Sequence, residues 1–367
     1  MPTRRTFIQH AALGTAALAA TPFASVYAHT SRTRRQKIGI ALVGLGYYSR
    51  DLLAPALQEC SDCYLAGVVT GTPSKAEEWM AEYDIPEGNV YDYDSYDQIA
   101  NNDAIDAVYV VLPNALHAEY TIRAANAGKH VICEKPMAMN TAECIQMMDA
   151  CAKNKVKLSI GYRMQFEPHT QAVMAMGQEQ QFGPVRHVIA VAGYREGRPE
   201  HWKTNGPMGG GAMMDMGVYP LQGARYVLGE EPIRVMAQTT YQRPEMFEGR
   251  ADETTMVQLE FPSGAVAQLT TSLGFGGNYL KARAQQGWFE LEPFSSYGGI
   301  TGRSSDGPID FPAVNQQAVQ MDDQARSIRD DQPMRVPGLE GLLDMRVVDA
   351  VYASIASGNA VELDPWS

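Results

Sequence analysis

A glycine-rich turn directly after an apolar strand constrains the fold of this chain more than any other feature. Residues 38–43 form an apolar run, and Gly44-Leu45-Gly46-Tyr47-Tyr48-Ser49 follows it without a spacer. Two glycines allow a tight turn and a close backbone approach to a phosphate at a helix N-terminus, with Ser49 where a third glycine would stand. The turn therefore predicts a dinucleotide-binding strand-turn-helix unit.

Strand and helix patterns alternate beyond this turn as far as residue 158. Repeated βαβ units of this kind predict a parallel, doubly wound sheet. The expected strands after the first are 64–69, 107–112 and 130–133, and the expected helices are 49–58, 74–83, 115–127 and 141–153.

The pattern changes after Gly161. Longer strand-like segments separated by glycine-rich loops predict an open, mostly antiparallel sheet, and a last helix over 339–357 is expected to pack on the first domain. The fold class is thus α/β, with a dinucleotide-binding Rossmann domain over residues 29–158 and an α+β domain over residues 159–367. The expected strands of the second sheet are 185–192, 234–240, 255–261 and 266–272.

Residues 1–28 have the form of a twin-arginine (Tat) signal peptide. Arg4-Arg5 precedes a short alanine-rich stretch over 11–20, and Val26-Tyr27-Ala28 places small residues where a signal peptidase cleaves. The stretch is shorter than the roughly 20 residues of a membrane span. We therefore expect periplasmic localisation and no membrane attachment after cleavage, and export in the folded state would carry a bound cofactor along.

Charge and cysteine content exclude other classes. The net charge is −12, or −14 after cleavage, and no basic stripe follows the N-terminus, so no nucleic-acid partner is expected. The motif Cys60-Ser61-Asp62-Cys63 has neither the helix N-terminus of a redox pair nor the second ligand pair of a zinc site. We interpret it as structural and expect no metal.

The segment Thr70-Gly71-Thr72-Pro73-Ser74-Lys75 indicates which dinucleotide is bound. It lies where an NAD enzyme carries an acidic residue for the ribose hydroxyls, yet it contains no carboxylate. Hydroxyl groups and the Lys75 ammonium can instead bind a 2′-phosphate, which predicts NADP.

Three further motifs supply reactive groups. Glu134-Lys135-Pro136 and Pro113-Asn114 with His117 each follow a predicted strand, at the sheet edge where α/β folds place their chemistry. If a helix follows Gly209-Gly210-Gly211, Asp215 and Tyr219 are four residues apart and share one face.

These motifs resemble the Gfo/Idh/MocA oxidoreductases over essentially the whole mature chain. The resemblance implies a Rossmann domain joined to an open-faced sheet, so that residues 159–367 would serve substrate binding and dimerisation. It also implies a homodimer or homotetramer. The residues that carry it are Gly44-Leu45-Gly46, Pro113-Asn114-Ala115-Leu116-His117, Cys133-Glu134-Lys135-Pro136, Gly161-Tyr162-Arg163, the segment from Asp215 to Tyr219, and Glu340-Gly341-Leu342-Leu343-Asp344-Met345-Arg346.

Within that family the chain looks like the periplasmic glucose-fructose and aldose-aldose oxidoreductases, which keep NADP(H) bound. Tyr219 where most members have His, the Tat signal, Thr70-Gly71 and Tyr91-Asp92-Tyr93 carry this likeness. Only residues 29–36 precede the first strand, whereas the glucose-fructose enzymes have a long proline-rich arm there. The aldose-aldose type therefore fits better.

The resemblance implies an enzyme that oxidises an aldose such as glucose to its lactone and reduces a second aldose or ketose to an alditol by a ping-pong mechanism. Tyr219 would transfer the proton, Lys135 would lower its pKa, and Asp215 would orient the sugar or Lys135. The alternatives are a sugar dehydrogenase with exchangeable NADP and a non-catalytic sugar-binding protein. The expected cofactor-binding residues are Gly44, Gly46, Tyr47, Tyr48, Thr70, Gly71, Ser74, Lys75, Tyr93, Leu112, Asn114, His117, Glu134, Lys135, Arg163 and Trp202.

Overall fold

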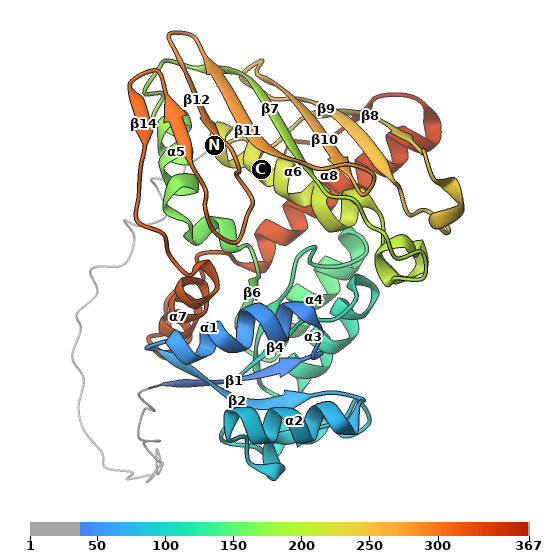
Figure 1. Cartoon of the computed structure of the whole chain (residues 1–367), viewed down its shortest axis with the longest axis vertical. Helices are drawn as coiled ribbons and strands as arrows, with labels where there is room; N and C mark the ends of the chain where they lie inside the picture. Colours follow the sequence, from blue (N-terminus) through green and yellow to red (C-terminus); the bar gives the residue numbers. More distant parts are fainter. Residues whose placement is uncertain (1–36, 366–367) are drawn as a thin grey trace, which may run out of the picture. The chain divides into compact units, whose positions relative to one another are not determined.

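A six-stranded parallel sheet organises the first half of the described chain. The computed structural model describes residues 37–365 (Figure 1), so the predicted signal peptide lies outside the described residues. The strand order is β3-β2-β1-β4-β5-β6, and the chain reverses its winding direction between β1 and β4, where doubly wound sheets bind their ligands. The strands are β1 (Ile38–Val43), β2 (Cys63–Val69), β3 (Val90–Tyr91), β4 (Ala107–Val110), β5 (His130–Cys133) and β6 (Leu158–Ile160). The domain boundary predicted after residue 158 falls inside β6.

A nine-stranded sheet follows, with the order β14-β13-β12-β11-β7-β10-β9-β8-β15. Its neighbouring strands pair antiparallel except for β7 and β10, which run parallel. The predicted combination of a Rossmann sheet with an open, mostly antiparallel sheet is confirmed. The strands are β7 (Val185–Gly193), β8 (Arg234–Thr240), β9 (Thr254–Glu260), β10 (Val266–Ser272), β11 (Gly277–Ala284), β12 (Trp288–Leu291), β13 (Gly302–Ser304), β14 (Gly307–Ile309) and β15 (Val361–Glu362).

Helices cover both faces of the parallel sheet, and alternate residues of β1 point to the two sides. Ile38, Ile40 and Leu42 pack with α1, α2 and α7, while Ala41 and Val43 belong to a core that α3, α4 and α8 complete. The helices are α1 (Ala54–Glu59), α2 (Pro73–Tyr83), α3 (His117–Asn126), α4 (Thr141–Lys153), α5 (Pro168–Gln178), α6 (Val218–Leu228), α7 (Gln316–Arg329) and α8 (Gly338–Ser357). Within residues 37–365, no helix is both long and apolar enough to cross a membrane.

Local chemistry sets the helix bounds. The helix predicted over 141–153 has those bounds, since the Asn140 side chain accepts the N–H of Glu143 at 3.0 Å and caps its start. The helix predicted over 49–58 is instead a π-helical turn, Ser49–Leu53, followed by α1. Pro55 lacks an N–H and cannot continue an ordinary α-helical ladder, which explains the interruption.

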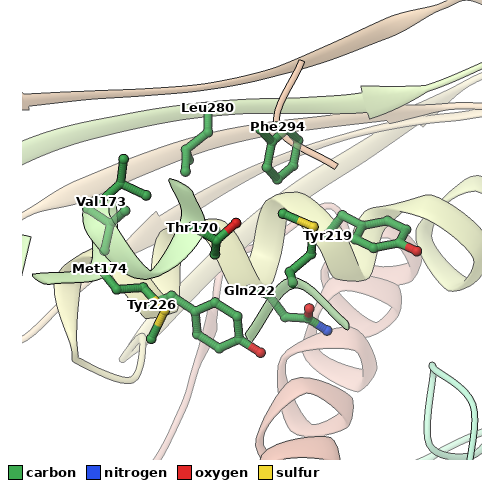
Figure 2. Close-up of a pocket in the computed structure, with 11 residues that line it drawn as sticks. Thr170, Val173, Met174, Tyr219, Gln222, Tyr226, Leu280 and Phe294 are labelled. Atoms are coloured by element: carbon green, nitrogen blue, oxygen red, sulfur yellow. The ribbon is translucent and has the colours of Figure 1, made fainter. Parts of the chain in front are cut away.

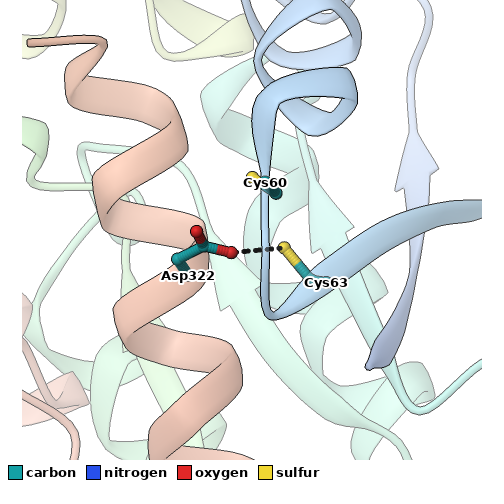
Figure 3. Close-up of side chains that lie close together, drawn as sticks. All are labelled: Cys60, Cys63 and Asp322. Carbon is teal, nitrogen blue, oxygen red and sulfur yellow. Dashed lines mark hydrogen bonds between the residues drawn. The ribbon is translucent and has the colours of Figure 1, made fainter. Parts of the chain in front are cut away.

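Helix α7 also holds the Cys60–Cys63 turn (Figure 3). The Asp322 carboxylate accepts the N–H groups of Ser61 and Asp62 at 3.0 and 2.7 Å, and the Cys63 sulfur lies 3.8 Å from it. The neighbouring Cys60 thiol and burial raise the pKa of Cys63, which favours the thiol over the thiolate. Asp322 thus joins the turn to α7 through its backbone.

A buried ion network joins α6 to α8. The Arg225 guanidinium bonds to Asp344 at 2.6 Å, to Glu231 at 2.7 Å and to Glu340 at 3.3 Å, and the Arg225 and Asp344 side chains are almost fully buried. Burial raises the pKa of Asp344 to about 6, against the opposing charge of Arg225. Removing one partner of such a network leaves the other charges buried without compensation.

We predict that Arg225→Met lowers the free energy of unfolding by about 3–5 kcal/mol, because the acidic side chains lose their buried cation. Urea unfolding followed by circular dichroism measures the loss. The matched control is Arg234→Met, whose half-exposed guanidinium pairs with Glu260 at 3.0 Å and should cost about 0–1 kcal/mol. Equal losses in the two variants would show that the network adds nothing specific.

Candidate active site

Every strand of the parallel sheet is followed by predicted site residues. Because parallel strands end at the same edge, these residues gather along one edge of the sheet. Gly44 to Tyr48 follow β1, Thr70 to Lys75 follow β2, Tyr93 follows β3, Leu112 to His117 follow β4, Glu134 and Lys135 follow β5, and Arg163 follows β6.

The glycine turn is shaped for a phosphate. Gly44 has φ +90°, and a Cβ there would lie 2.4 Å from the carbonyl oxygen of Val111. The Ser49 hydroxyl, where a third glycine was missing, donates to the carbonyl of Gly44 at 2.6 Å and so closes the turn. Gly46 is exposed, and no atom of residues 37–365 lies within 4 Å of the position that a Cβ would take there. A dinucleotide pyrophosphate therefore fits above Gly46 at the helix start.

The turn after β2 lies beside this loop. Lys75 Nζ donates to the carbonyl of Leu45 at 3.1 Å, and a Cβ on Gly71 would lie 3.2 Å from the Tyr93 ring. Residues 70–75 contribute hydroxyl groups and an ammonium but no carboxylate. This composition is compatible with a 2′-phosphate.

Two predicted residues after β4 hold neighbouring loops. The buried Asn114 amide donates to the carbonyl of Gly209 at 2.7 Å and so fixes the triple-glycine segment. The two ring nitrogens of His117 lie 2.8 and 2.9 Å from the carbonyl oxygens of Pro136 and Leu112. Burial lowers the pKa of His117, although both carbonyls favour its protonated form. Its ring nitrogens are thus engaged within the protein.

Glu134 is an internal anchor for the peptide of Lys135. Its carboxylate accepts the Tyr109 hydroxyl at 2.7 Å and the Lys135 N–H at 3.1 Å. Burial raises the pKa of Glu134 despite the nearby Lys135 ammonium. A Cβ on Gly161 would lie 2.4 Å from this carboxylate, so glycine is needed there.

Lys135 joins the sheet edge to the segment after the triple glycine. Its Nζ donates to the carbonyl of Asp215 at 2.7 Å and lies 3.9 Å from the Asp215 carboxylate. The same ammonium stands 4.7 Å above the Tyr219 ring. Asp215 belongs to a π-helical turn, Met213–Gly217, and Tyr219 to the first turn of α6, so both face Lys135 as the spacing predicted.

Asp215 has two further partners that the sequence did not indicate. Its carboxylate accepts the Tyr194 hydroxyl and the Lys203 ammonium, each at 2.9 Å. Burial opposes its charge, but Lys203 and Lys135 together hold the pKa of Asp215 below its usual value. Predicted Trp202 is the neighbour of Lys203 in sequence, and its ring lies 5.9 Å from the Lys203 ammonium.

Tyr219 faces a second buried cation, Arg163. The Arg163 guanidinium donates to the Tyr219 hydroxyl at 3.3 Å and lies 5.1 Å from its ring centroid. Its other polar partners are neutral, namely the carbonyls of Ser295 and Ser296 and the Gln316 side chain. Among residues 37–365, no carboxylate forms an ion pair with Arg163. A buried cation without a carboxylate partner favours an anion nearby, and the phenol can supply one.

The pKa of Tyr219 reflects this setting. Burial raises it, but the charges of Arg163 and Lys135 outweigh burial and place the pKa below the ordinary value of a phenol.

A cavity of about 10 Å³ lies beside Tyr219, which is one of its lining residues. The Tyr219 hydroxyl points away from this cavity (Figure 2). This cavity has room for about one water. Its lining is mostly apolar and comprises Met164, Thr170, Val173, Met174, Tyr219, Gln222, Gly223, Tyr226, Val227, Leu280 and Phe294.

One aromatic residue of the site gave no signal in the sequence. The Tyr297 ring lies 4.5 Å from the Arg163 guanidinium and 5.9 Å from the Tyr48 ring. It belongs to the loop between β12 and β13, which has no periodic pattern. Together these residues form a phosphate-binding turn, a cation-flanked phenol and a paired carboxylate, which is an arrangement suited to proton transfer beside a dinucleotide.

The chain is similar to known oxidoreductases in sequence and in fold. The profile of the oxidoreductase family with an NAD-binding Rossmann fold (GFO_IDH_MocA) matches residues 38–162, and the GFO/IDH/MocA C-terminal domain matches residues 170–291. The crystal structure of aldose-aldose oxidoreductase from Caulobacter crescentus, complexed with glycerol, is 38% identical, covers 89% of this chain and 100% of its own, and has a TM-score of 0.87.

Two archaeal relatives match over most of their length. The D-xylose 1-dehydrogenase [NADP(+)] of Haloarcula marismortui is 28% identical over 350 residues, covering 89% of this chain and 93% of the relative. The D-xylose 1-dehydrogenase (NADP(+)) 2 of Haloferax volcanii is 29% identical over 334 residues, covering 89% and 98%.

We predict that Lys135→Met raises the pKa of Tyr219, because a nearby cation that favours the phenolate is lost. Phenolate absorbance is titrated against pH in each protein with and without Tyr219→Phe, so that the difference isolates Tyr219. Lys203→Met is the control, since its ammonium bonds to Asp215 and should shift the Tyr219 midpoint less. An unchanged midpoint in Lys135→Met would remove Lys135 as the residue that tunes the phenol.

Proposed function

The chain belongs to the Gfo/Idh/MocA oxidoreductase family, and from this premise we propose that it is a periplasmic aldose-aldose oxidoreductase that keeps NADP(H) bound. It oxidises an aldose such as glucose at C1 to the lactone and reduces a second aldose or ketose to an alditol. The observation that carries the proposal is the buried Arg163 guanidinium directed at the Tyr219 hydroxyl, with Lys135 over the same ring. The 38% identity to an aldose-aldose oxidoreductase supports the substrate class.

Tyr219 transfers a proton in both directions. When the first sugar is oxidised, the phenolate takes the proton of the C1 hydroxyl, and in the reduction the phenol returns a proton to the carbonyl oxygen. NADP(H), when bound, supplies the hydride acceptor and donor. Lys135 and Arg163 stabilise the phenolate, which brings the phenol closer to a working pH.

The Asp215 carboxylate orients this centre. It holds Lys135 in place, and its oxygens can accept a hydroxyl of the sugar in exchange for the Tyr194 hydroxyl. One phenol serves both half-reactions in turn, and we infer a ping-pong cycle in which the donor lactone leaves before the acceptor binds. Through the predicted Tat signal, the enzyme is exported to the periplasm in the folded state with its cofactor already bound.

A second candidate is a sugar dehydrogenase with exchangeable NADP. The two archaeal xylose dehydrogenases favour it, since both are named for NADP and match nearly full length. The two candidates share the phenol and differ in whether the cofactor leaves after each turnover.

We predict that the purified protein, with no cofactor added, develops the absorbance of a reduced nicotinamide when glucose is supplied and loses it when a second aldose follows. A retained dinucleotide is the physical reason, because only it can store the hydride between the two sugars. Mass spectrometry of the supernatant after denaturation identifies the cofactor as NADP(H). A cofactor-free protein that is active only with added NADP would support the exchangeable dehydrogenase instead.

We predict that Tyr219→Phe keeps the bound cofactor but slows both half-reactions by roughly 10²-fold or more, the usual worth of a positioned acid-base group. Stopped-flow absorbance follows each half-reaction separately. Tyr226→Phe is the matched control, because Tyr226 lies on the same helix, is equally buried, and its hydroxyl has no hydrogen-bond partner among the described residues. Rates near wild type in Tyr219→Phe would exclude this phenol, and no absorbance change with any sugar would favour a binding protein.

A further inference from the structure

Tyr297 lies between the two regions that a bound dinucleotide must connect. Its ring is 5.9 Å from that of Tyr48 in the glycine turn, where the pyrophosphate fits. On the other side the Arg163 guanidinium lies 4.5 Å from the ring, and Arg163 in turn reaches the Tyr219 hydroxyl at 3.3 Å. Tyr297 therefore lies between the phosphate turn and the arginine that contacts the Tyr219 phenol.

The stem of the Tyr297 loop is firmly anchored. Phe294 is buried against α6 at the apolar cavity (Figure 2), and its N–H and that of Ser295 donate to the Asn278 side chain at 3.0 and 2.9 Å. The carbonyls of Ser295 and Ser296 both accept from Arg163. Residues 294–296, the stem of the loop, are therefore held by hydrogen bonds to Asn278 and Arg163 that do not involve the tip of the loop.

The tip of the same loop has few contacts. Gly298 and Gly299 follow Tyr297, and Gly299 has φ +68°. In the described part of the chain, no atom lies within 4 Å of the positions that their Cβ atoms would take. Tyr297 itself is 43% exposed, which is high for an aromatic ring placed against two buried or half-buried groups. A glycine pair with free space around it allows the tip to turn while the stem is held.

We propose that Tyr297 is a cofactor-retaining residue, closing through its contacts with Tyr48 and Arg163 over the path between the phosphate turn and the phenol. A dinucleotide leaving the site must displace the ring from at least one of these contacts. The proposal rests on the proposed function for the identity of the ligand, NADP(H), and its test measures ligand release independently of catalysis.

Ring contacts of these two kinds are together worth about a tenfold change in an equilibrium or rate. Tyr297→Ala should therefore release NADPH about tenfold faster, while Tyr297→Phe, which keeps the ring, should stay close to wild type. Each protein is loaded with NADPH and mixed with an excess of an NADPH-consuming enzyme, and the decay of the bound nicotinamide fluorescence gives the release rate. Tyr297→Leu repeats the test with a side chain of intermediate size.

Tyr241→Ala is the matched control. Tyr241 is 42% exposed, its hydroxyl donates to the carbonyl of Ala251 at 3.3 Å, and it lies outside the proposed site. Its removal should leave the release rate unchanged. A wild-type release rate in both Tyr297→Ala and Tyr297→Leu, with folding verified by circular dichroism, would overturn the inference.

Failure of the proposed function gives a different result. If the wild type retains no cofactor, the same variants are compared by the dissociation constant for added NADPH in a fluorescence titration. A roughly tenfold weaker affinity in Tyr297→Ala would still support the role of the ring. An unchanged affinity in Tyr297→Ala would show that Tyr297 does not retain the cofactor, whether or not the proposed function holds.

Discussion

The site depends on the interactions of the Lys135 ammonium, because they join the end of β5 to the segment that carries Asp215 and Tyr219. A buried ammonium needs partners, and it finds them in a backbone carbonyl, a carboxylate and an aromatic face. The carbonyl of Asp215 lies in an irregular segment, where the π-helical turn Met213–Gly217 passes into α6 and Pro220 has no N–H to donate.

Helix α7 (Gln316–Arg329), near the C-terminal end of the chain, supports this arrangement through hydrogen bonds. Gln316, Gln320 and Gln324 recur every four residues and are buried, so they form a polar row on the face that meets the sheet. Gln316 accepts from Arg163, and Gln320 donates at 2.9 Å to the Tyr109 hydroxyl, which in turn donates to Glu134. One helix face therefore holds both the arginine beside the phenol and the carboxylate behind the lysine. The positions of Arg163 and Lys135 therefore depend on the packing of α7 against the parallel sheet.

The sequence was informative where the chemistry lies at the end of a strand and uninformative where it depends on distant packing. Glu134, Lys135 and the glycine turn follow apolar strands directly, so their place at one sheet edge follows from parallel topology alone. Helix α7 was missed because its buried face carries glutamines, which hide the apolar periodicity that predicts a helix. Tyr297 lies in a loop and Lys203 in a single 3-10 turn, Trp202–Thr204, and only tertiary contacts bring them to Arg163 and Asp215.

A phenol as proton-transfer group makes demands that explain the remaining charges. In water it titrates near pH 10, and burial alone moves its pKa further up. Two cations on different elements are required to reverse that shift, and each must avoid being neutralised by the carboxylates nearby. Lys135 shares Asp215 with Lys203, so the carboxylate is divided between two ammonium groups. Besides the phenol, Arg163 donates to neutral oxygens and to the Met164 sulfur, and the described residues include no carboxylate that pairs with it. The positive charge left over at Tyr219 favours the phenolate against the effect of burial, whereas a neutral surrounding of the same shape would raise the pKa of the phenol.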